Sequence, residues 1–220
     1  MLPVGIHDNV VVSKAEINEQ GTLEIEFKQP GANNALEALT GDAELTPERS
    51  VNIRIYPQNV EYFGERRDGT KMLSLITNFR AVLTELLKIY IPNPDIQATK
   101  GLTVTQDNVN TVFGDQANVD VAYKNITTQF VEQITPFINS DTKFRVKLPR
   151  RSKKYAFASL PNFTPWVESM DIPKEASKLK WSQWEIDNGK NSSTPATDTA
   201  DDSEVSQQLE ELNDVFNEQS

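Results

Sequence analysis

The sequence predicts a mainly β protein in which two helices are inserted between the third and fourth of five strands. Three segments within the first 56 residues carry apolar side chains at alternate positions, as strands do. Residues 72–90 and 121–138 instead repeat apolar side chains every three to four residues, which is helical spacing. Two further alternating segments follow. This order suits an OB-fold-like five-stranded barrel, and an α+β sandwich fits it as the alternative.

The N-terminal strands are predicted at residues 7–18, 22–28 and 50–56. Gly21 marks the turn that joins the first two into an antiparallel hairpin, and Pro57 ends the third. Because successive side chains of a strand point to opposite faces, one face of the second and third strands is apolar. The side chains on that face are Leu23, Ile25, Phe27, Val51, Ile53 and Ile55.

The helices at residues 72–90 and 121–138 are separated by a predicted loop over residues 93–118. Pro92 ends the first helix, since proline lacks the backbone donor that a helix interior needs. We expect Pro136 to kink or shorten the last turn of the second helix.

The last two strands are predicted at residues 143–148 and 155–160, with residues 149–154 as the loop of the hairpin between them. Residues 162–180 contain Pro165 and Pro173 and show neither strand nor helix periodicity, so we expect them to be irregular.

Charge is distributed unevenly along the chain. The net charge is −10, but residues 191–220 hold 8 acidic residues and no Lys or Arg, which leaves 22 basic and 24 acidic residues in residues 1–190. We therefore expect a nearly neutral folded domain over residues 1–188. A flexible linker over residues 189–201 and an acidic amphipathic tail over residues 202–220 complete the chain.

Composition and motifs argue against an enzyme. The chain has 0 Cys and 1 His, His7, which excludes a thiolate metal site and weakens any His-based catalysis. Gly64 to Gly69 lacks the Lys and the Ser or Thr of a phosphate-binding loop. We expect no cofactor, and neither a signal peptide nor a transmembrane span is predicted.

The most informative segment runs from residue 143 to residue 157, which holds 7 of the 22 basic residues and no acid. On a strand, Phe144, Val146 and Leu148 would face the core and the intervening cations would face solvent. Cations that follow phosphates, beside aromatic rings that stack on unpaired bases, are what single-strand binding requires. The residues predicted to contact nucleic acid here are Lys143, Arg145, Lys147, Arg150, Arg151, Lys153, Lys154, Tyr155 and Phe157.

Arg54 and Tyr56 repeat this pairing of a cation and an aromatic ring on the third strand. Two alternatives stay open for both groups. A basic hairpin can be a solvated edge that discourages aggregation, and strand aromatics are commonly part of the core. We expect Trp181 and Trp184 to pack on the body as a strap rather than to stack on bases.

The tail carries apolar side chains at the spacing of one helix face, namely Val205, Leu209, Leu212 and Phe216. Such a stripe on an acidic segment is typical of a peptide that docks in a groove of a partner protein. The tail could also fold back on the basic surface and compete with nucleic acid in a salt-sensitive way. A purely solubilising tail is the alternative.

Residues 2–10 (LPVGIHDNV), 160–163 (LPNF) and 166–170 (WVESM), with the acidic end, resemble single-stranded DNA-binding proteins of tailed bacteriophages. The resemblance covers both ends of the body and the tail. It implies an OB-fold protein in the cytoplasm of an infected bacterial host that coats replication intermediates. The acidic C-terminus would recruit replication and recombination proteins, and self-association stays open. Family members often end in an aromatic residue, whereas Phe216 stands four residues before the end.

The competing prediction is a viral structural or assembly protein, such as a scaffold or virion component. That protein would use the basic hairpin and the tail for protein contacts, and binding to a poly(dT) oligonucleotide separates the two predictions.

Overall fold

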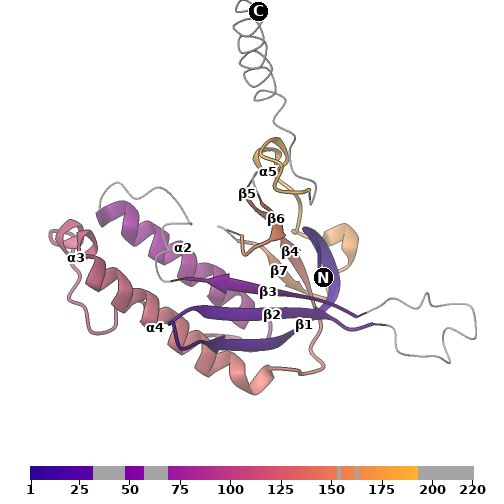
Figure 1. Ribbon diagram of the computed structural model, residues 1–220, viewed down its shortest axis with the longest axis horizontal. Helices are drawn as coiled ribbons and strands as arrows, with labels where there is room; N and C mark the ends of the chain where they lie inside the picture. The colour runs from indigo at the N-terminus through magenta and orange to yellow at the C-terminus, as the bar shows by residue number, and fades with distance from the viewer. Residues whose placement is uncertain (32–47, 57–68, 153–154, 162–163, 193–220) are drawn as a thin grey trace, which may run out of the picture.

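The fold is built on a five-stranded antiparallel sheet with helices against one face (Figure 1). The computed structural model describes residues 1–31, 48–56, 69–152, 155–161 and 164–192, and for residues 151, 152 and 155–157 it describes the backbone alone. The sheet comprises β1 (Gly5–Ile17), β2 (Leu23–Gln29), β3 (Arg49–Ile55), β4 (Phe144–Leu148) and β7 (Val167–Ser169), in the spatial order β3-β2-β1-β4-β7. The three predicted N-terminal strands are thus confirmed.

The long strand β1 pairs with two other strands. Its C-terminal half pairs with β2 from Val11 to Ile17, and its N-terminal half pairs with β4 from Gly5 to Val10. Both ladders contain a register shift, and Asn9 adopts a positive φ of 58° between the halves. Bulges bend a strand and increase its twist. The bend lets β1 join the β2–β3 pair to the β4–β7 pair.

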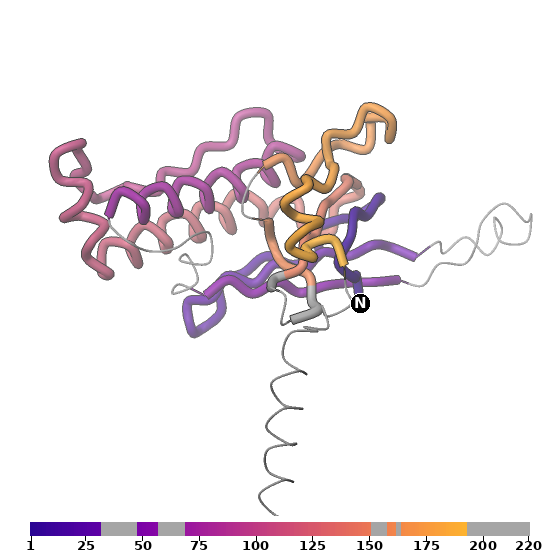
Figure 2. The backbone as a smooth tube through the Cα atoms, turned by 90° about the horizontal axis from the view of Figure 1, so that it is seen from above, coloured from indigo at the N-terminus to yellow at the C-terminus, as the bar shows by residue number. Residues whose placement is uncertain are grey.

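The helices α2 (Gly69–Leu87) and α4 (Gln116–Ile134) run side by side over one face of β1, β2 and β3, as Figure 2 shows from above. Both predicted helices are confirmed, because their periodic apolar side chains are buried. These are Met72, Leu75, Ile76, Phe79, Val82, Leu83, Leu86 and Leu87 on α2, and Val119, Ala122, Ile126, Phe130 and Ile134 on α4. None of the helices in the described ranges is long and apolar enough to cross a bilayer.

An aromatic cluster joins the two parts of the sheet to the helices. Phe27 on β2 makes edge contacts with Phe144 on β4 and with Trp166, at ring-centroid distances of 6.2 and 5.9 Å. The Trp166 indole N–H donates a 3.0 Å hydrogen bond to the Val82 carbonyl on α2. The rings are fully buried, so the core is continuous across β1.

The short helix α3 (Val109–Gly114) and the start of α4 fall where the sequence predicts a loop. α3 lies within the predicted loop over residues 93–118, and α4 begins before that loop was expected to end. The 3-10 helix η2 (Thr135–Phe137) contains Pro136 and follows α4 directly, in line with the expected shortening. Six residues are too few for periodicity to identify α3, which is fixed instead by its buried Phe113 and its packing against α2.

The predicted pairing of the last two strands is wrong. β4 pairs with β1 and β7, whereas residues 155–158 form β6 and pair with β5 (Arg150–Ser152) in a separate two-stranded hairpin. The fifth strand of the main sheet, β7, lies in the segment predicted to be irregular. Among the described residues the sheet is open, with β3 and β7 as its two edges, and no strand pairing closes it into a barrel.

A C-terminal strap, defined here as residues 171–192, runs past β4. It contains the 3-10 helix η3 (Lys174–Ala176) and the short helix α5 (Gln183–Asp187). The Arg150 N–H donates a 2.9 Å hydrogen bond to the Lys190 carbonyl. The folded body therefore extends to Lys190, two residues into the predicted linker.

Candidate nucleic-acid interface

Arg145 does not face solvent as predicted. Its side chain is 4% exposed and lies between two carboxylates, with Nε 2.5 Å from Asp8 and Nη1 hydrogen-bonded to Glu168. Lys174 on η3 approaches Asp8 from outside at 2.8 Å. The strap and β7 cover the face of β4 that strand alternation assigns to solvent, so Arg145 is a structural cation rather than a phosphate contact.

The carboxylates around Arg145 are held in their charged form. Burial acts to raise the pKa of Asp8, but hydrogen bonds from Lys174 and Arg145 outweigh it and lower that pKa. Burial likewise acts to raise the pKa of Glu168, whereas hydrogen bonds from Ser177, Arg145 and the Lys178 N–H lower it.

Lys147 is also buried rather than exposed. Its Nζ lies 3.0 Å from Glu185 Oε1, and both side chains are nearly inaccessible. The same ammonium donates to the Lys180 carbonyl at 3.2 Å and lies 5.5 Å from the Trp181 ring centroid. Lys147 therefore ties β4 to α5, and Trp181 packs on the body as predicted.

Arg150 is 1% exposed, so the prediction that it caps an exposed loop is wrong as well. Its backbone N–H and carbonyl contact Lys190, whose Nζ donates to that carbonyl at 3.2 Å. Burial and the nearby Arg150 charge lower the pKa of Lys190. The start of β5 is thus enclosed by the end of the strap.

Arg54 is accessible, with its side chain 58% exposed, but its charge is compensated by Glu24 at 3.0 Å. Glu24 Oε2 also lies 3.3 Å from Lys14 Nζ and accepts a hydrogen bond from the Asn52 side-chain amide at 3.4 Å. Burial acts to raise the pKa of Glu24, while hydrogen bonds from Lys14, Asn52 and Asn18 and the Arg54 charge lower it. Tyr56, two residues after Arg54, is partly exposed.

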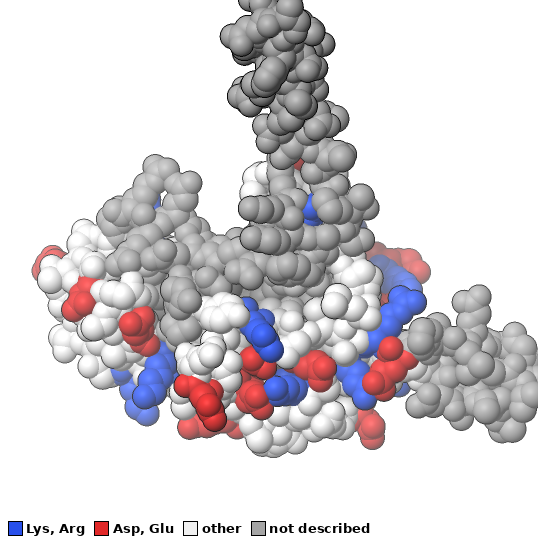
Figure 3. Space-filling model, viewed as in Figure 1, with Lys and Arg blue, Asp and Glu red and all other residues white. Residues whose placement is uncertain are grey.

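The charge distribution on the face of the molecule shown in Figure 3 reflects such ion pairs. Described Lys and Arg side chains alternate there with Asp and Glu, and no continuous basic patch forms among them.

Of the other predicted contacts, Lys143 is exposed just before β4. The β5–β6 ladder pairs Arg150 with Ala158 and Ser152 with Tyr155. The remaining candidates lie outside the described side chains: Arg151, Lys153, Lys154, Tyr155, Phe157 and the tail residues Val205, Leu209, Leu212 and Phe216.

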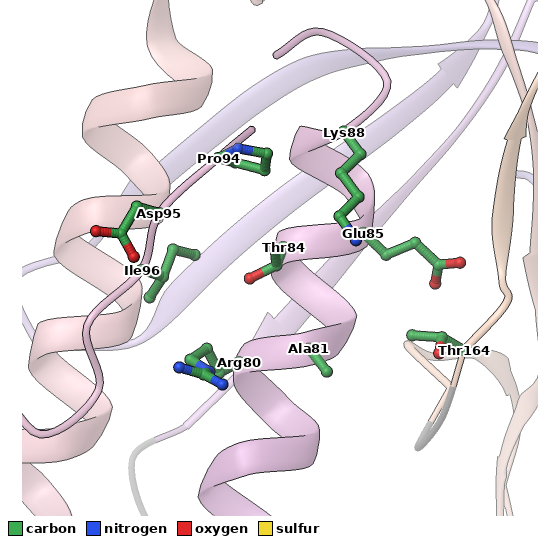
Figure 4. Close-up of a pocket in the computed structure, with 9 residues that line it drawn as sticks. All are labelled: Arg80, Ala81, Thr84, Glu85, Lys88, Pro94, Asp95, Ile96 and Thr164. Carbon is green, nitrogen blue, oxygen red and sulfur yellow. The ribbon is translucent and has the colours of Figure 1, made fainter. Parts of the chain in front are cut away.

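Two surface features were not predicted. Trp184 on α5 is 57% exposed, although the sequence predicted that it packs on the body. A groove along α2 is lined by Arg80, Thr84, Glu85 and Lys88, with Pro94 to Ile96 opposite (Figure 4). Burial raises the pKa of Glu85 to about 7, although a hydrogen bond from the backbone N–H of Trp166 acts to lower it. Neither feature has a motif that would have marked it in the sequence.

Comparisons with known protein families, curated proteins and solved structures gave no match. Within the described ranges, no group of three or more His, Asp or Glu side chains is arranged to hold a metal ion.

Proposed function

We propose that this chain binds single-stranded DNA without sequence preference, as a single-stranded DNA-binding protein of the tailed-bacteriophage type acting in replication or recombination within an infected bacterial cell. In this proposal the basic hairpin holds the phosphates. The acidic tail recruits partner proteins and competes with the DNA for the same surface.

The observation that carries the proposal is the strand order β3-β2-β1-β4-β7. An OB fold is a partly open five-stranded barrel whose first strand pairs with both the second and the fourth, as β1 does here. Counted this way, β7 is the fifth strand. The β5–β6 hairpin then occupies the loop between strands four and five, which is one of the loops that contact oligonucleotides in OB folds.

The electrostatic support comes from fewer cations than the 7 basic residues of the segment 143–157. Arg145, Lys147 and Arg150 are buried. Arg151, Lys153 and Lys154 follow in the same acid-free segment and, with the exposed Lys143, are the cations to which the proposal assigns the phosphates.

The test is fluorescence anisotropy of a labelled poly(dT) oligonucleotide at several salt concentrations. We expect binding that weakens steeply with salt. A single-strand phosphate contact contributes about 0.7 to the slope of log affinity against log salt. The triple variant Arg151→Glu, Lys153→Glu, Lys154→Glu should therefore lower the slope by about 2.

The matched control reverses three exposed cations elsewhere in the body, Arg80, Lys100 and Lys124, and should change binding much less. Removing residues 193–220, which include all 8 acids of the C-terminal segment, should strengthen binding. Absence of poly(dT) binding at low salt would overturn the proposal. An equal loss in both triple variants would show that binding does not depend on the hairpin.

A further inference from the structure

Trp184 is the largest apolar side chain in the described part of the chain that is mainly exposed to solvent, at 57%. Tryptophan is usually well buried on average, and its indole offers a wide flat face. The contrast within the chain is clear, because Trp166 is fully buried and Trp181 packs against the core. An indole in this position needs an explanation.

The exposure of Trp184 does not come from a loosely attached helix. The next residue, Glu185, is 2% exposed and forms the buried ion pair with Lys147. Ser182 and Glu185 form a reciprocal capping box at the start of α5. The Trp184 carbonyl accepts hydrogen bonds from both nitrogens of Asn188, at 3.0 and 2.8 Å. The backbone that carries the indole is therefore fixed from both sides.

The helix that carries the indole lies beside the β5–β6 hairpin. The Lys190 N–H donates to the Glu185 carbonyl at 2.7 Å, and the Lys190 carbonyl accepts from the Arg150 N–H at 2.9 Å. Two backbone hydrogen bonds thus connect α5 to the first residue of β5, and Figure 1 shows α5 next to β5 and β6. Lys178 and Lys180, on the strap a few residues before Trp184, are exposed cations.

We propose that Trp184 stacks on an unpaired base of a single-stranded DNA whose phosphates contact the β5–β6 hairpin. A rigid exposed indole supplies the π-face of a single-strand site, and the cations of the β5–β6 hairpin would supply its positive charge. Lys147 and Glu185 act as positioning residues, since their ion pair orients α5. This inference rests on the proposed function and adds to it the aromatic residue that the sequence analysis assigned to packing.

The test compares Trp184→Ala, Trp184→Phe and the matched control Ile186→Ala, an exposed apolar side chain on the same helix at 44% exposure. The probes are a labelled (dT) oligonucleotide and an abasic oligonucleotide of equal length, which has the same phosphates without bases. One stacked base corresponds to about a 5- to 150-fold change in affinity. We expect Trp184→Ala to weaken dT binding within that range, with an unchanged salt slope and unchanged abasic binding. Trp184→Phe should retain most of the affinity and Ile186→Ala nearly all.

Intrinsic fluorescence gives a second readout. DNA should quench the unmodified protein, and Trp184→Phe should lose most of that quenching although two tryptophans remain. If the unmodified protein binds dT and Trp184→Ala binds it equally well, the stacking assignment is wrong while the proposed function stands. If the unmodified protein does not bind dT, both are overturned.

One further outcome would replace the stacking role with a protein contact. If Trp184→Ala and Ile186→Ala weaken binding equally and both lower the molecular mass measured by sedimentation, the two side chains form an interface between copies of the chain. That result also overturns the proposal.

Discussion

Lys147 Nζ lies 3.0 Å from Glu185 Oε1, and both side chains are at most 4% exposed. The pair links β4, in the sheet, to α5, in the strap. With the Arg145–Glu168 pair, it means that two cations of the basic segment bind acids of the same chain. The strap is thereby attached to the sheet by buried charge as well as by apolar packing.

We expect Glu185→Gln to destabilise the fold by about 3–5 kcal/mol, because Lys147 would remain buried without a compensating charge. The control is Asp187→Asn, an exposed acid on the same helix, which should stay within about 0.5 kcal/mol of the unmodified protein. Urea unfolding followed by circular dichroism measures both. A change below about 1 kcal/mol for Glu185→Gln would show that the pair is not closed in solution.

The acid side of the stability profile follows from Glu168, whose pKa is lowered in the folded state. A depressed carboxyl pKa contributes stability that is present above the unfolded pKa, near 4.5, and is lost as the pH falls through the folded pKa. We therefore expect the destabilisation caused by Glu168→Gln to be full at pH 6 and to shrink as the pH falls from about 4.5 towards 2. Urea unfolding of both proteins over this range tests it. A destabilisation independent of pH would contradict the assignment.

The sequence predicts the fold well where the periodicity of apolar side chains within one strand or helix determines which of them are buried. It fails for Arg145 and Lys147, whose partners Glu168 and Glu185 follow 23 and 38 residues later, in a segment without regular periodicity. Strand alternation predicts on which face of a sheet a side chain lies, but not whether another segment covers that face. The one available signal was that both acids stand among large apolar residues, which is unusual for solvated carboxylates.

The same limit applies to the candidate site. Clustered positive charge in a sequence does not distinguish cations that meet phosphates from cations that meet acids of the same chain. Trp184 was assigned to packing because tryptophan is usually buried. Its exposure depends on the inward orientation of the adjacent Glu185, which is held by the ion pair with Lys147 and the capping box with Ser182.

Tyr123 joins α4 to two strands of the sheet. Its hydroxyl accepts a hydrogen bond from the Leu23 N–H at 3.1 Å and donates one to the Ile55 carbonyl at 2.5 Å. Tyr123→Phe would leave both buried backbone groups without this partner, so we expect a loss of about 1–3 kcal/mol. Val121→Ala, at an exposed position of the same helix, is the control and should change stability little. An effect of Tyr123→Phe no larger than that of the control would mean that other groups replace the hydroxyl.

Glu85 predicts a pH effect of the opposite sign to that of Glu168. Burial raises its pKa to about 7 from 4.5, while the Trp166 N–H, which donates to Oε2 at 3.3 Å, and the charges of Lys88 and Lys147 act to lower it. The folded state therefore binds a proton more tightly than the unfolded state, and the stability linked to that proton is lost as the pH rises through about 7. Glu85→Gln is neutral at every pH and avoids this loss. Its stability relative to the unmodified protein should thus increase from pH 5 to pH 8.5. Most of this increase should be complete slightly above pH 7.

Urea unfolding at pH 5, 7 and 8.5 measures the Glu85 effect, with Glu132→Gln as the control because Glu132 is an exposed acid on α4. The control should show no comparable trend between pH 5 and 8.5, because Glu132 is exposed to solvent and substitution there removes no buried group. A difference between Glu85→Gln and the unmodified protein that is equal at all three pH values would show that the carboxyl is ionised in the fold at pH 5. In that case the groove along α2 would hold a charged acid beside Lys88 rather than a neutral one.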